Sequence, residues 1–378
     1  MFDTNHYIPV LRWKAAEKEA LRQMSSKDRE TMTPLIELMM PRPPELYKGD
    51  TKEERDKRKE EKSPTELWEE SIELFKKALP KVPEDISKCW GETPLFVDVR
   101  FVDGSIRAQA LDDLLSLGKE HNLFMVPVVN MIPIIDLESD KRIRDIAVKY
   151  AKEDDRGLCL RLLRSNLLRK ETLESEIKKF LTTTELVEGQ IDLIADFGVA
   201  DAEYAILVDS LGSIPNLRAW RGFAVISGAF PQDLIEFELG YNKTERIDWN
   251  NWVDPKTFDK LLRKPAFGDY TIQCPTYKEP PRISFPSASI RYTANTEFVI
   301  MRGQGGPKKE TKQYLANAQL LAGLQEFDGA NFSYGDAYIA EKAKDLSSSQ
   351  TGSPTTWLVA GINHHLAKAV SQIATLPD

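Results

Sequence analysis

The sequence predicts an α/β fold, a closed (β/α)8 barrel of the TIM type with a C-terminal α+β extension that caps the barrel mouth. Eight apolar runs of strand length occur before residue 276, and helical patterns lie between most of them. A run count of eight over roughly 260 residues favours a closed barrel over an open sheet. No Gly-x-Gly-x-x-Gly motif follows the first run, which also disfavours a dinucleotide-binding fold.

Each run has a strand-like composition and ends near a turn or a helical pattern. The predicted strands are 7–13, 33–40, 94–102, 124–130, 157–163, 191–198, 219–231 and 265–272. The predicted helices are 14–24, 63–79, 105–120, 139–153, 171–183, 201–211 and a short helix after Pro231. Ser63, Pro64 and Glu66 give the second of these helices a clear start, because Ser caps a helix and Pro suits its first turn.

The chain divides into a barrel over residues 1–275 and an extension over residues 276–378. A charged, proline-bounded insert interrupts the barrel at residues 41–64. In the extension, residues 287–306 resemble one or two strands, and residues 310–327 have helical periodicity. A Gly/Pro turn, a short apolar run and a final helix that begins near His364 complete the chain.

Composition limits the classes of partner. The net charge is −8 and the pI is about 5.4, which argues against nonspecific binding to duplex DNA. Cys89, Cys159 and Cys274 are scattered, as expected in a reducing cytoplasm, and they do not form a cysteine zinc knuckle. No signal-peptide pattern and no apolar run of about 18 residues occurs, so we expect a cytoplasmic protein without a membrane span.

Polar residues lie near the end of every predicted strand, where barrel enzymes place their chemistry. In strand order they are Arg12 and Lys14, Glu37, Asp98 and Arg100, Asn130, Arg161, Asp196, Ser227, and Asp269. Strand periodicity puts Asp98 and Arg100 on one face and Val97 and Val99 on the other, so the charged pair is expected to point into the barrel mouth. The alternative is a buried ion pair that fills the upper layer without a catalytic role.

The acidic members of this set suggest a reaction centre. We expect Glu37, Asp98, Asp196 and Asp269 to be catalytic, with Glu37, Asp196 and Asp269 as ligands of Mg²⁺. Arg12, Arg100 and Arg161 are expected either to neutralise these acids or to hold a phosphate. Acids mixed with arginines favour an anionic ligand over an uncharged sugar.

The C-terminal blocks contribute further candidates. His364 and His365 are adjacent, so their side chains point about 100° apart on a helix and do not easily share one metal ion. They are either packed and capping residues or include a general acid/base. His6 and His121 are expected to be peripheral. Asp336 is either a helix N-cap or a ligand-binding residue.

Several strings together resemble one known family. They are YIPVLRWKAAEKEAL, TPLIEL, FGDYTI, SIRYT, FSYGDAYI and WLVAGINHHLAKAVSQI. In order and spacing they are similar to the beta protein family of bacteria and their phages, from Tyr7 to Ile373. The resemblance implies a setting among mobile elements and anti-phage loci, but no reaction. The family favours Lys in the first strand where this chain has Arg12, with Lys14 nearby.

The resembling blocks carry many of the same polar residues, and we expect the C-terminal ones to fold over the mouth. The expected ligand-binding residues are Arg12, Lys14, Arg100, Arg161, Arg291, Tyr292, Asp336 and Asn363. The leading hypothesis is an anti-phage defence protein that binds a nucleotide-like or nucleic-acid-derived ligand, with metal-assisted phosphoester cleavage if it is an enzyme. The alternative is a non-catalytic sensor or assembly subunit that binds a partner protein from the same locus.

Overall fold

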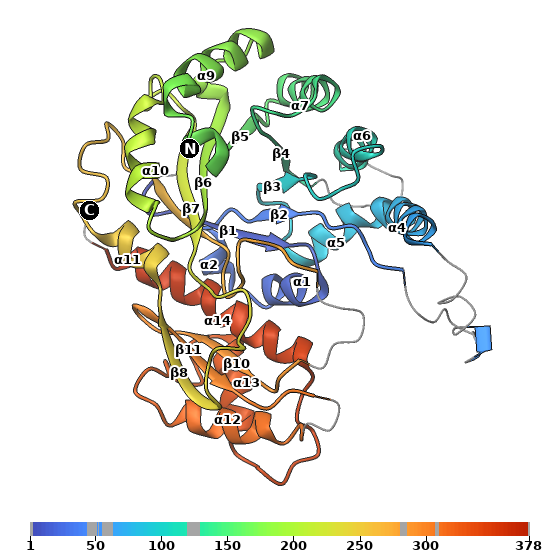
Figure 1. Ribbon diagram of the computed structural model, residues 1–378, viewed down its shortest axis with the longest axis vertical. Coiled ribbons are helices and arrows are strands. Elements are labelled where there is room, and N and C mark those ends of the chain that lie inside the picture. Colours follow the sequence, from blue (N-terminus) through green and yellow to red (C-terminus); the bar gives the residue numbers. More distant parts are fainter. Residues whose placement is uncertain are drawn as a thin grey trace.

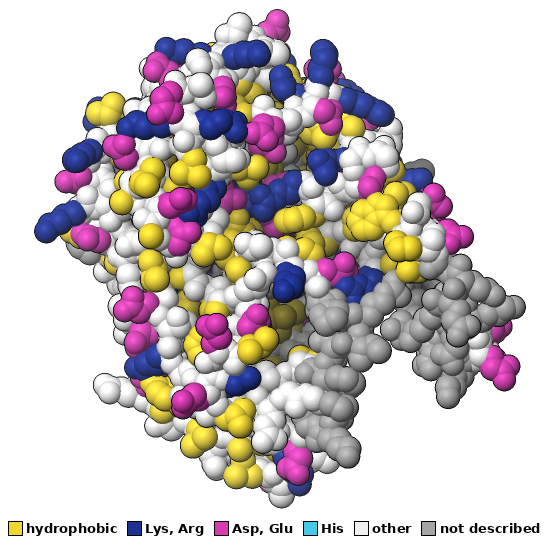
Figure 2. All heavy atoms as spheres, viewed as in Figure 1, with side chains coloured by type: hydrophobic (Ala, Val, Ile, Leu, Met, Phe, Trp, Pro, Cys, Tyr) yellow, Lys and Arg dark blue, Asp and Glu magenta, His cyan; other side chains and the backbone are white. Residues whose placement is uncertain are grey.

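The computed structural model describes residues 3–43, 51, 53–54, 63–118, 129–279, 286–306 and 310–376. Most of the predicted insert at 41–64, together with His121, therefore lies outside the described residues. Within them, no helix is both long enough and apolar enough to span a bilayer. Acidic and basic side chains are interspersed over the described part of the face shown in Figure 2.

Eight parallel strands close into a barrel in the order β1-β2-β3-β4-β5-β6-β7-β9 (Figure 1). The strands are β1 (Tyr7–Arg12), β2 (Leu35–Glu37), β3 (Leu95–Asp98), β4 (Met131–Ile135), β5 (Leu158–Leu163), β6 (Ile191–Val199), β7 (Gly222–Gly228) and β9 (Ala266–Asp269). Helices connect most of them, as parallel neighbours require. The predicted (β/α)8 barrel is confirmed.

Helices cover the outside of the barrel. They are α1 (Ala15–Arg22), α2 (Ser26–Arg29), α4 (Pro64–Ala78), α5 (Val82–Cys89), α6 (Arg107–Leu117), α7 (Lys141–Glu153), α8 (Arg164–Leu167), α9 (Lys170–Thr184), α10 (Tyr204–Ser210) and α11 (Ile247–Val253), with 3-10 turns at Leu79–Lys81, Glu188–Gln190 and Leu211–Ser213. The predicted start of α4 is confirmed, because Ser63 and Glu66 form a capping box.

Two predicted elements are wrong. The fourth strand was expected at 124–130, of which 124–128 lie outside the described residues. The fourth strand of the barrel, β4, begins at Met131, so Asn130 precedes it instead of ending it. Two apolar runs, FMVPVV and MIPII, adjoin here, and apolarity does not distinguish them. No helix follows Pro231; instead β8 (Gly240–Glu245) comes before α11.

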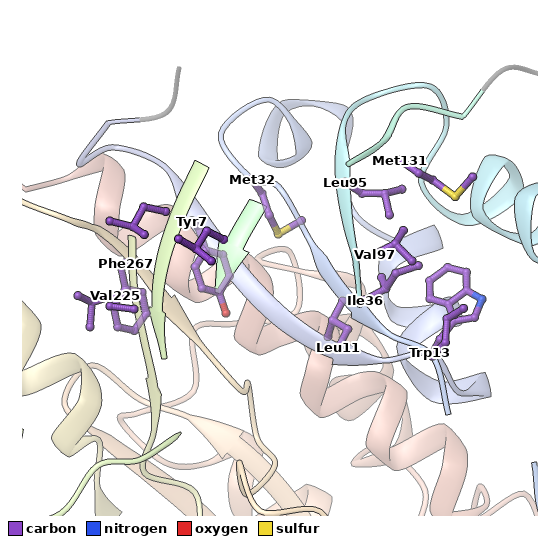
Figure 3. Close-up of a cluster of buried hydrophobic side chains, with 14 of the residues drawn as sticks. Tyr7, Leu11, Trp13, Met32, Ile36, Leu95, Val97, Met131, Val225 and Phe267 are labelled. Carbon is purple, nitrogen blue, oxygen red and sulfur yellow. The ribbon is translucent and has the colours of Figure 1, made fainter. Parts of the chain in front are cut away.

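Strand periodicity divides the core into two parts. The barrel interior contains Ile8, Val10, Leu35, Phe96, Ile132, Ile134, Cys159, Ile194, Ala224, Ile226, Ala266 and Tyr270. The intervening positions belong to a larger cluster shared with the helices, in which Figure 3 shows Leu11, Ile36 and Val97 from three neighbouring strands. Continued at a period of two, the interior face leads to Arg12, Glu37, Asp98, Arg161 and Asp196. The top layer of the interior is therefore polar.

A smaller sheet lies beside the barrel. It has the antiparallel order β10-β11-β8, from β10 (Ile290–Thr293), β11 (Glu297–Arg302) and β8. Helices α12 (Gln313–Ala322) and α13 (Tyr334–Lys342) pack near it. Because β8 precedes residue 276 but pairs with β11, the small sheet draws on both sides of that position, and the division of the chain there stays a prediction.

Helix α14 (Pro354–Ala374) joins the two parts, and in Figure 1 it runs between the barrel and the small sheet. It packs against α1 on one side and against α13 and β10 on the other. A Cβ at Gly361 would lie 2.7 Å from the Arg291 carbonyl oxygen, so only glycine permits this approach. The final helix was expected to begin near His364; it begins ten residues earlier, where Ser353 caps it.

Candidate functional site

Arg161, on β5, is the centre of the polar layer at the carboxyl ends of the strands. Its guanidinium group lies 2.9 Å from Glu37 Oε1 and 2.7 Å from both Asp98 Oδ2 and Asp196 Oδ2. The Tyr270 hydroxyl accepts a hydrogen bond from Arg161 at 2.8 Å and donates one to Asp196 at 2.7 Å. The Arg161 side chain is only 1% exposed. Five interior side chains from distant segments therefore form one buried network, which we call the Arg161 cluster.

Electrostatics hold this network in its charged form. Burial opposes the charge on Arg161, but Tyr270 and the carboxylates raise the pKa of Arg161 well above its ordinary value. Burial alone would raise the pKa of Asp196, yet Arg161 and Arg100 outweigh it and lower that pKa. Removing one partner from such a network leaves uncompensated buried charge, so its members are strongly interdependent.

Arg100 is a sixth member of the Arg161 cluster and covers it on its solvent side. Its Nη2 lies 2.8 Å from Glu37 Oε1, while its side chain remains 24% exposed. Together with Asp98 and Arg161 it borders a cavity of about 360 Å³, whose other wall includes Asp136. Burial raises the pKa of Asp136. Acids and arginines share this lining, so the cavity has no clear preference for an anion.

Asp269 belongs to a different cluster, although it also ends a barrel strand. Its Oδ1 accepts the Tyr7 hydroxyl at 2.6 Å, and its Oδ2 lies 2.8 Å from His365 Nε2. His365 Nδ1 lies 2.8 Å from Thr293 Oγ1, and all four side chains are buried. Burial lowers the pKa of His365, and Asp269 opposes that shift. The histidine therefore joins β1 and β9 to β10 as a neutral ring.

Strand periodicity explains why Asp269 does not meet Glu37 and Asp196. Asp269 shares a face with Phe267, which lies in the outer cluster, whereas the next residue, Tyr270, points inward. The three predicted Mg²⁺ ligands therefore do not converge. Among the described residues, no group of three or more His, Cys, Asp or Glu side chains is arranged to hold a metal ion.

His364 and Asp336 form a second buried histidine–carboxylate pair. Its Nδ1 lies 2.8 Å from Asp336 Oδ2, and its Nε2 donates to the Thr293 carbonyl oxygen at 2.8 Å. Asp336 Oδ1 accepts the Tyr292 hydroxyl at 2.8 Å, and the Tyr292 and His364 rings stack at 3.8 Å. Burial would raise the pKa of Asp336, but the His364 hydrogen bond lowers it. This pair links α14, α13 and β10.

Two further predictions about this region have structural outcomes. Asp336 is not the N-cap of α13: Ser333 is, and its hydroxyl accepts the Asp336 N–H at 3.2 Å. Asn363 accepts the Gly335 N–H at 3.0 Å and donates to the Ala20 carbonyl oxygen at 3.1 Å. Its side chain thus fastens α14 to α1 and α13.

A separate pocket of about 420 Å³ lies at the barrel mouth, between β1, β10 and the first turn of α14. Arg12, Lys14, Lys278 and Arg291 line it, and we call it the basic pocket. Within the described part of the chain, none of these four cations forms an ion pair with a carboxylate. Arg12 donates to the Gln273 side chain at 3.0 Å and to two backbone carbonyl oxygens, and Arg291 donates to the Ile272 carbonyl oxygen at 2.9 Å.

Glu17 is the acidic residue on the wall of the basic pocket. Its Oε1 accepts a hydrogen bond from Gln273 Nε2 at 2.7 Å, and Gln273 in turn accepts one from Arg12. Its Oε2 is buried without a hydrogen-bond partner among the described residues. Burial raises the pKa of Glu17. Gln273 thus lies between this carboxyl group and Arg12, and among the described residues Glu17 forms no ion pair with a cation of the pocket.

The structure therefore separates the predicted residues into groups. Glu37, Asp98, Arg100, Arg161 and Asp196 come together in the Arg161 cluster, while Arg12, Lys14 and Arg291 surround the basic pocket. The remaining candidates, Asp269, Tyr292, Asp336, Asn363, His364 and His365, are buried in contacts that join α14 to its neighbours. Whether any of them has a catalytic role stays a prediction.

Several residues at these sites were missed. Tyr270 could have been found, because it continues the alternation that places Ala266 inside the barrel. Asp136 directly follows β4 and was hidden by the misplaced strand. Glu17 and Tyr277 gave no such signal. Glu17 lies in an ordinary amphipathic helix, and Tyr277 lies in a loop.

Fold and sites together define a class: an α/β-barrel protein whose mouth carries a sealed ionic network and a neighbouring basic pocket. A family model described as Beta protein matches residues 7–371, nearly the whole chain. The chain belongs to this family, and the predicted resemblance is confirmed. No curated protein matches it.

Proposed function

We propose that this protein binds an anionic, phosphate-bearing ligand of the nucleotide or nucleic-acid-derived class in the basic pocket. The observation that carries the proposal is a set of four cations around one cavity, Arg12, Lys14, Lys278 and Arg291, none of which has a carboxylate partner among the described residues. By contrast, Arg161 and Arg100 are paired with acids. Arg12 is buried and Arg291 is half-buried, and such cations without counter-charge favour binding of an anion.

The position of the pocket supports a phosphate in particular. Pro231 and Gln232 from the segment after β7, and residues 273–274 and 276–278 after β9, contribute to its wall. These segments follow the seventh and eighth strands of the barrel, where TIM barrels frequently bind phosphate. Thr355, in the first turn of α14, also lines the pocket, and the positive end of a helix dipole favours an anion.

Arg291 is the cation that we expect to gain most from a bound anion. Burial lowers the pKa of Arg291 to about 10, so its guanidinium group remains protonated at neutral pH while poorly solvated. A poorly solvated cation gains more from a bound anion than an exposed one does. The Arg291 guanidinium carbon lies 4.8 Å from the centroid of the Phe230 ring, and this cation–π contact orients the side chain.

The setting that we propose, defence of bacteria against phages, comes from the family resemblance and not from the geometry. Phosphoester cleavage is not part of the proposal, because the acids expected to hold Mg²⁺ are divided between two clusters and are already bonded to Arg161, Tyr7 and His365. Binding without cleavage is what the basic pocket supports best.

Titration calorimetry with pyrophosphate tests the proposal. We expect one site per chain, with an affinity at least tenfold lower in Arg291→Met, because one of the four cations that line the pocket is lost. The matched control is Arg142→Met, which removes an exposed arginine outside the pocket and should bind like the wild type. Failure of the wild-type protein to bind pyrophosphate, or equal binding by Arg291→Met, would contradict the proposal.

A further inference from the structure

A second cavity, of about 540 Å³, adjoins the basic pocket. The two cavities share Lys14, Ala15 and Tyr277. Away from this shared wall the lining of the second cavity is mostly apolar, and we call it the apolar groove. Its apolar residues include Trp13, Leu38, Met39, Met40, Phe75, Leu79 and Val82. The charged residues Lys18, Arg42, Lys81, Asp85 and Glu279 also line it.

Tyr277 is the partition between the two cavities. Its hydroxyl accepts a hydrogen bond from Lys14 Nζ at 3.0 Å, and the Lys14 ammonium group lies 4.5 Å from its ring centroid. The Arg12 guanidinium carbon lies 4.9 Å from the same centroid, and Phe101 meets the ring edge-on at 6.0 Å. Two cations of the basic pocket thus hold an aromatic ring at the entrance to the apolar groove.

We infer that the ligand is an organic phosphate with an aromatic or apolar body, whose phosphate occupies the basic pocket and whose body occupies the apolar groove. The inference rests on the proposed function, because binding of the phosphate in the basic pocket positions the rest of the ligand at the apolar groove. A site with a few charged groups at one end and an apolar cavity at the other is typical for ligands that are part ionic and part apolar. Nucleotides belong to this class.

The basic pocket and the apolar groove differ in chemistry, so each is expected to bind a different part of the ligand. An inorganic anion would use only the cations and would leave the apolar groove filled with water. A ligand with an aromatic body also removes apolar surface of Met39, Met40 and Phe75 from water, which strengthens binding in proportion to the area covered. Affinity should therefore depend on the body as well as on the phosphate.

The test compares inorganic phosphate with 1-naphthyl phosphate in calorimetric titrations at one pH and one salt concentration. For the wild-type protein we expect 1-naphthyl phosphate to bind at least tenfold more tightly. The double variant Met39→Gln/Met40→Gln alters two partly exposed residues of the apolar groove without changing charge. It should reduce that ratio at least fivefold while phosphate itself binds as in the wild type.

Arg291→Met is the matched control, since it should weaken both ligands by the same factor and leave their ratio unchanged. Equal affinity of the wild-type protein for the two ligands would overturn the inference and leave the proposed function standing. If neither ligand binds to the wild-type protein, the proposed function is overturned instead. If the double variant does not fold, the wild-type ratio alone decides.

Discussion

Two arginine-rich regions of the barrel mouth differ in how their charge is balanced. In the Arg161 cluster, three carboxylates surround two guanidinium groups, and Arg161 is almost completely buried. In the basic pocket, the cations line an open cavity, and among the described residues none of them forms an ion pair with the nearby Glu17, whose pKa is raised by burial. The comparison teaches that charge at a barrel mouth indicates a ligand only where the protein has not already neutralised it.

The largest expected effect comes from breaking the Arg161 cluster. Arg161→Met leaves Glu37, Asp98 and Asp196 close together with only Arg100 to balance them. Loss of one partner from a buried ionic network costs about 3–5 kcal/mol of unfolding free energy. Urea denaturation followed by circular dichroism measures the loss. A variant as stable as the wild type would show that the cluster is not the structural element described above.

A milder change in the same cluster is Tyr270→Phe. It removes a hydroxyl that bonds to both Arg161 and Asp196 and leaves the ring in place. Arg161 and Asp196 each lose a buried hydrogen-bond partner, which should lower the free energy of unfolding by about 1–3 kcal/mol. The chain should still fold, and its affinity for pyrophosphate should not change. Weaker pyrophosphate binding would mean that the two regions are coupled.

The smallest effect concerns Glu17 and depends on pH. Because burial raises the pKa of Glu17, folding favours its neutral form, and the wild-type protein loses stability as pH rises above the ordinary glutamate value of about 4.5. Glu17→Gln is neutral at every pH and keeps an acceptor for Gln273. Its free energy of unfolding should depend less on pH from about 4.5 up to the raised pKa of Glu17, which denaturation at several pH values from about 4 upward measures. Parallel curves for the two proteins would contradict the raised pKa.

The sequence predicted the fold because a period of two and a period of 3.6 alternate along most of the barrel. The same periodicity placed Asp98 and Arg100 inside the barrel, and both lie at the Arg161 cluster. Asp269 was misplaced because it was judged by its position at the end of a strand and not by its face. Phe267, two residues earlier, belongs to the outer cluster and would have indicated the outward direction.

The basic pocket was predictable only in part. Arg12, Lys14 and Arg291 were each expected to bind a ligand, but nothing in the sequence shows that they share one cavity with Glu17. Lys14 meets Tyr277 across 263 residues of chain, and such contacts depend on how β10 and α14 pack against the barrel. Periodicity describes local structure, so it does not determine long-range contacts of this kind.

The most direct test of the division between the two regions compares Tyr270→Phe with Arg291→Met in thermal unfolding, with and without pyrophosphate. A ligand that binds only the folded state adds about 2.7 kcal/mol to the free energy of unfolding at a hundredfold excess over Kd, and the melting temperature rises as a result. We predict that Tyr270→Phe melts at a lower temperature but keeps the full shift with pyrophosphate, whereas Arg291→Met melts close to the wild type but loses most of the shift. The reverse pattern, in which Tyr270→Phe loses the shift and Arg291→Met keeps it, would place the ligand in the Arg161 cluster and contradict this account.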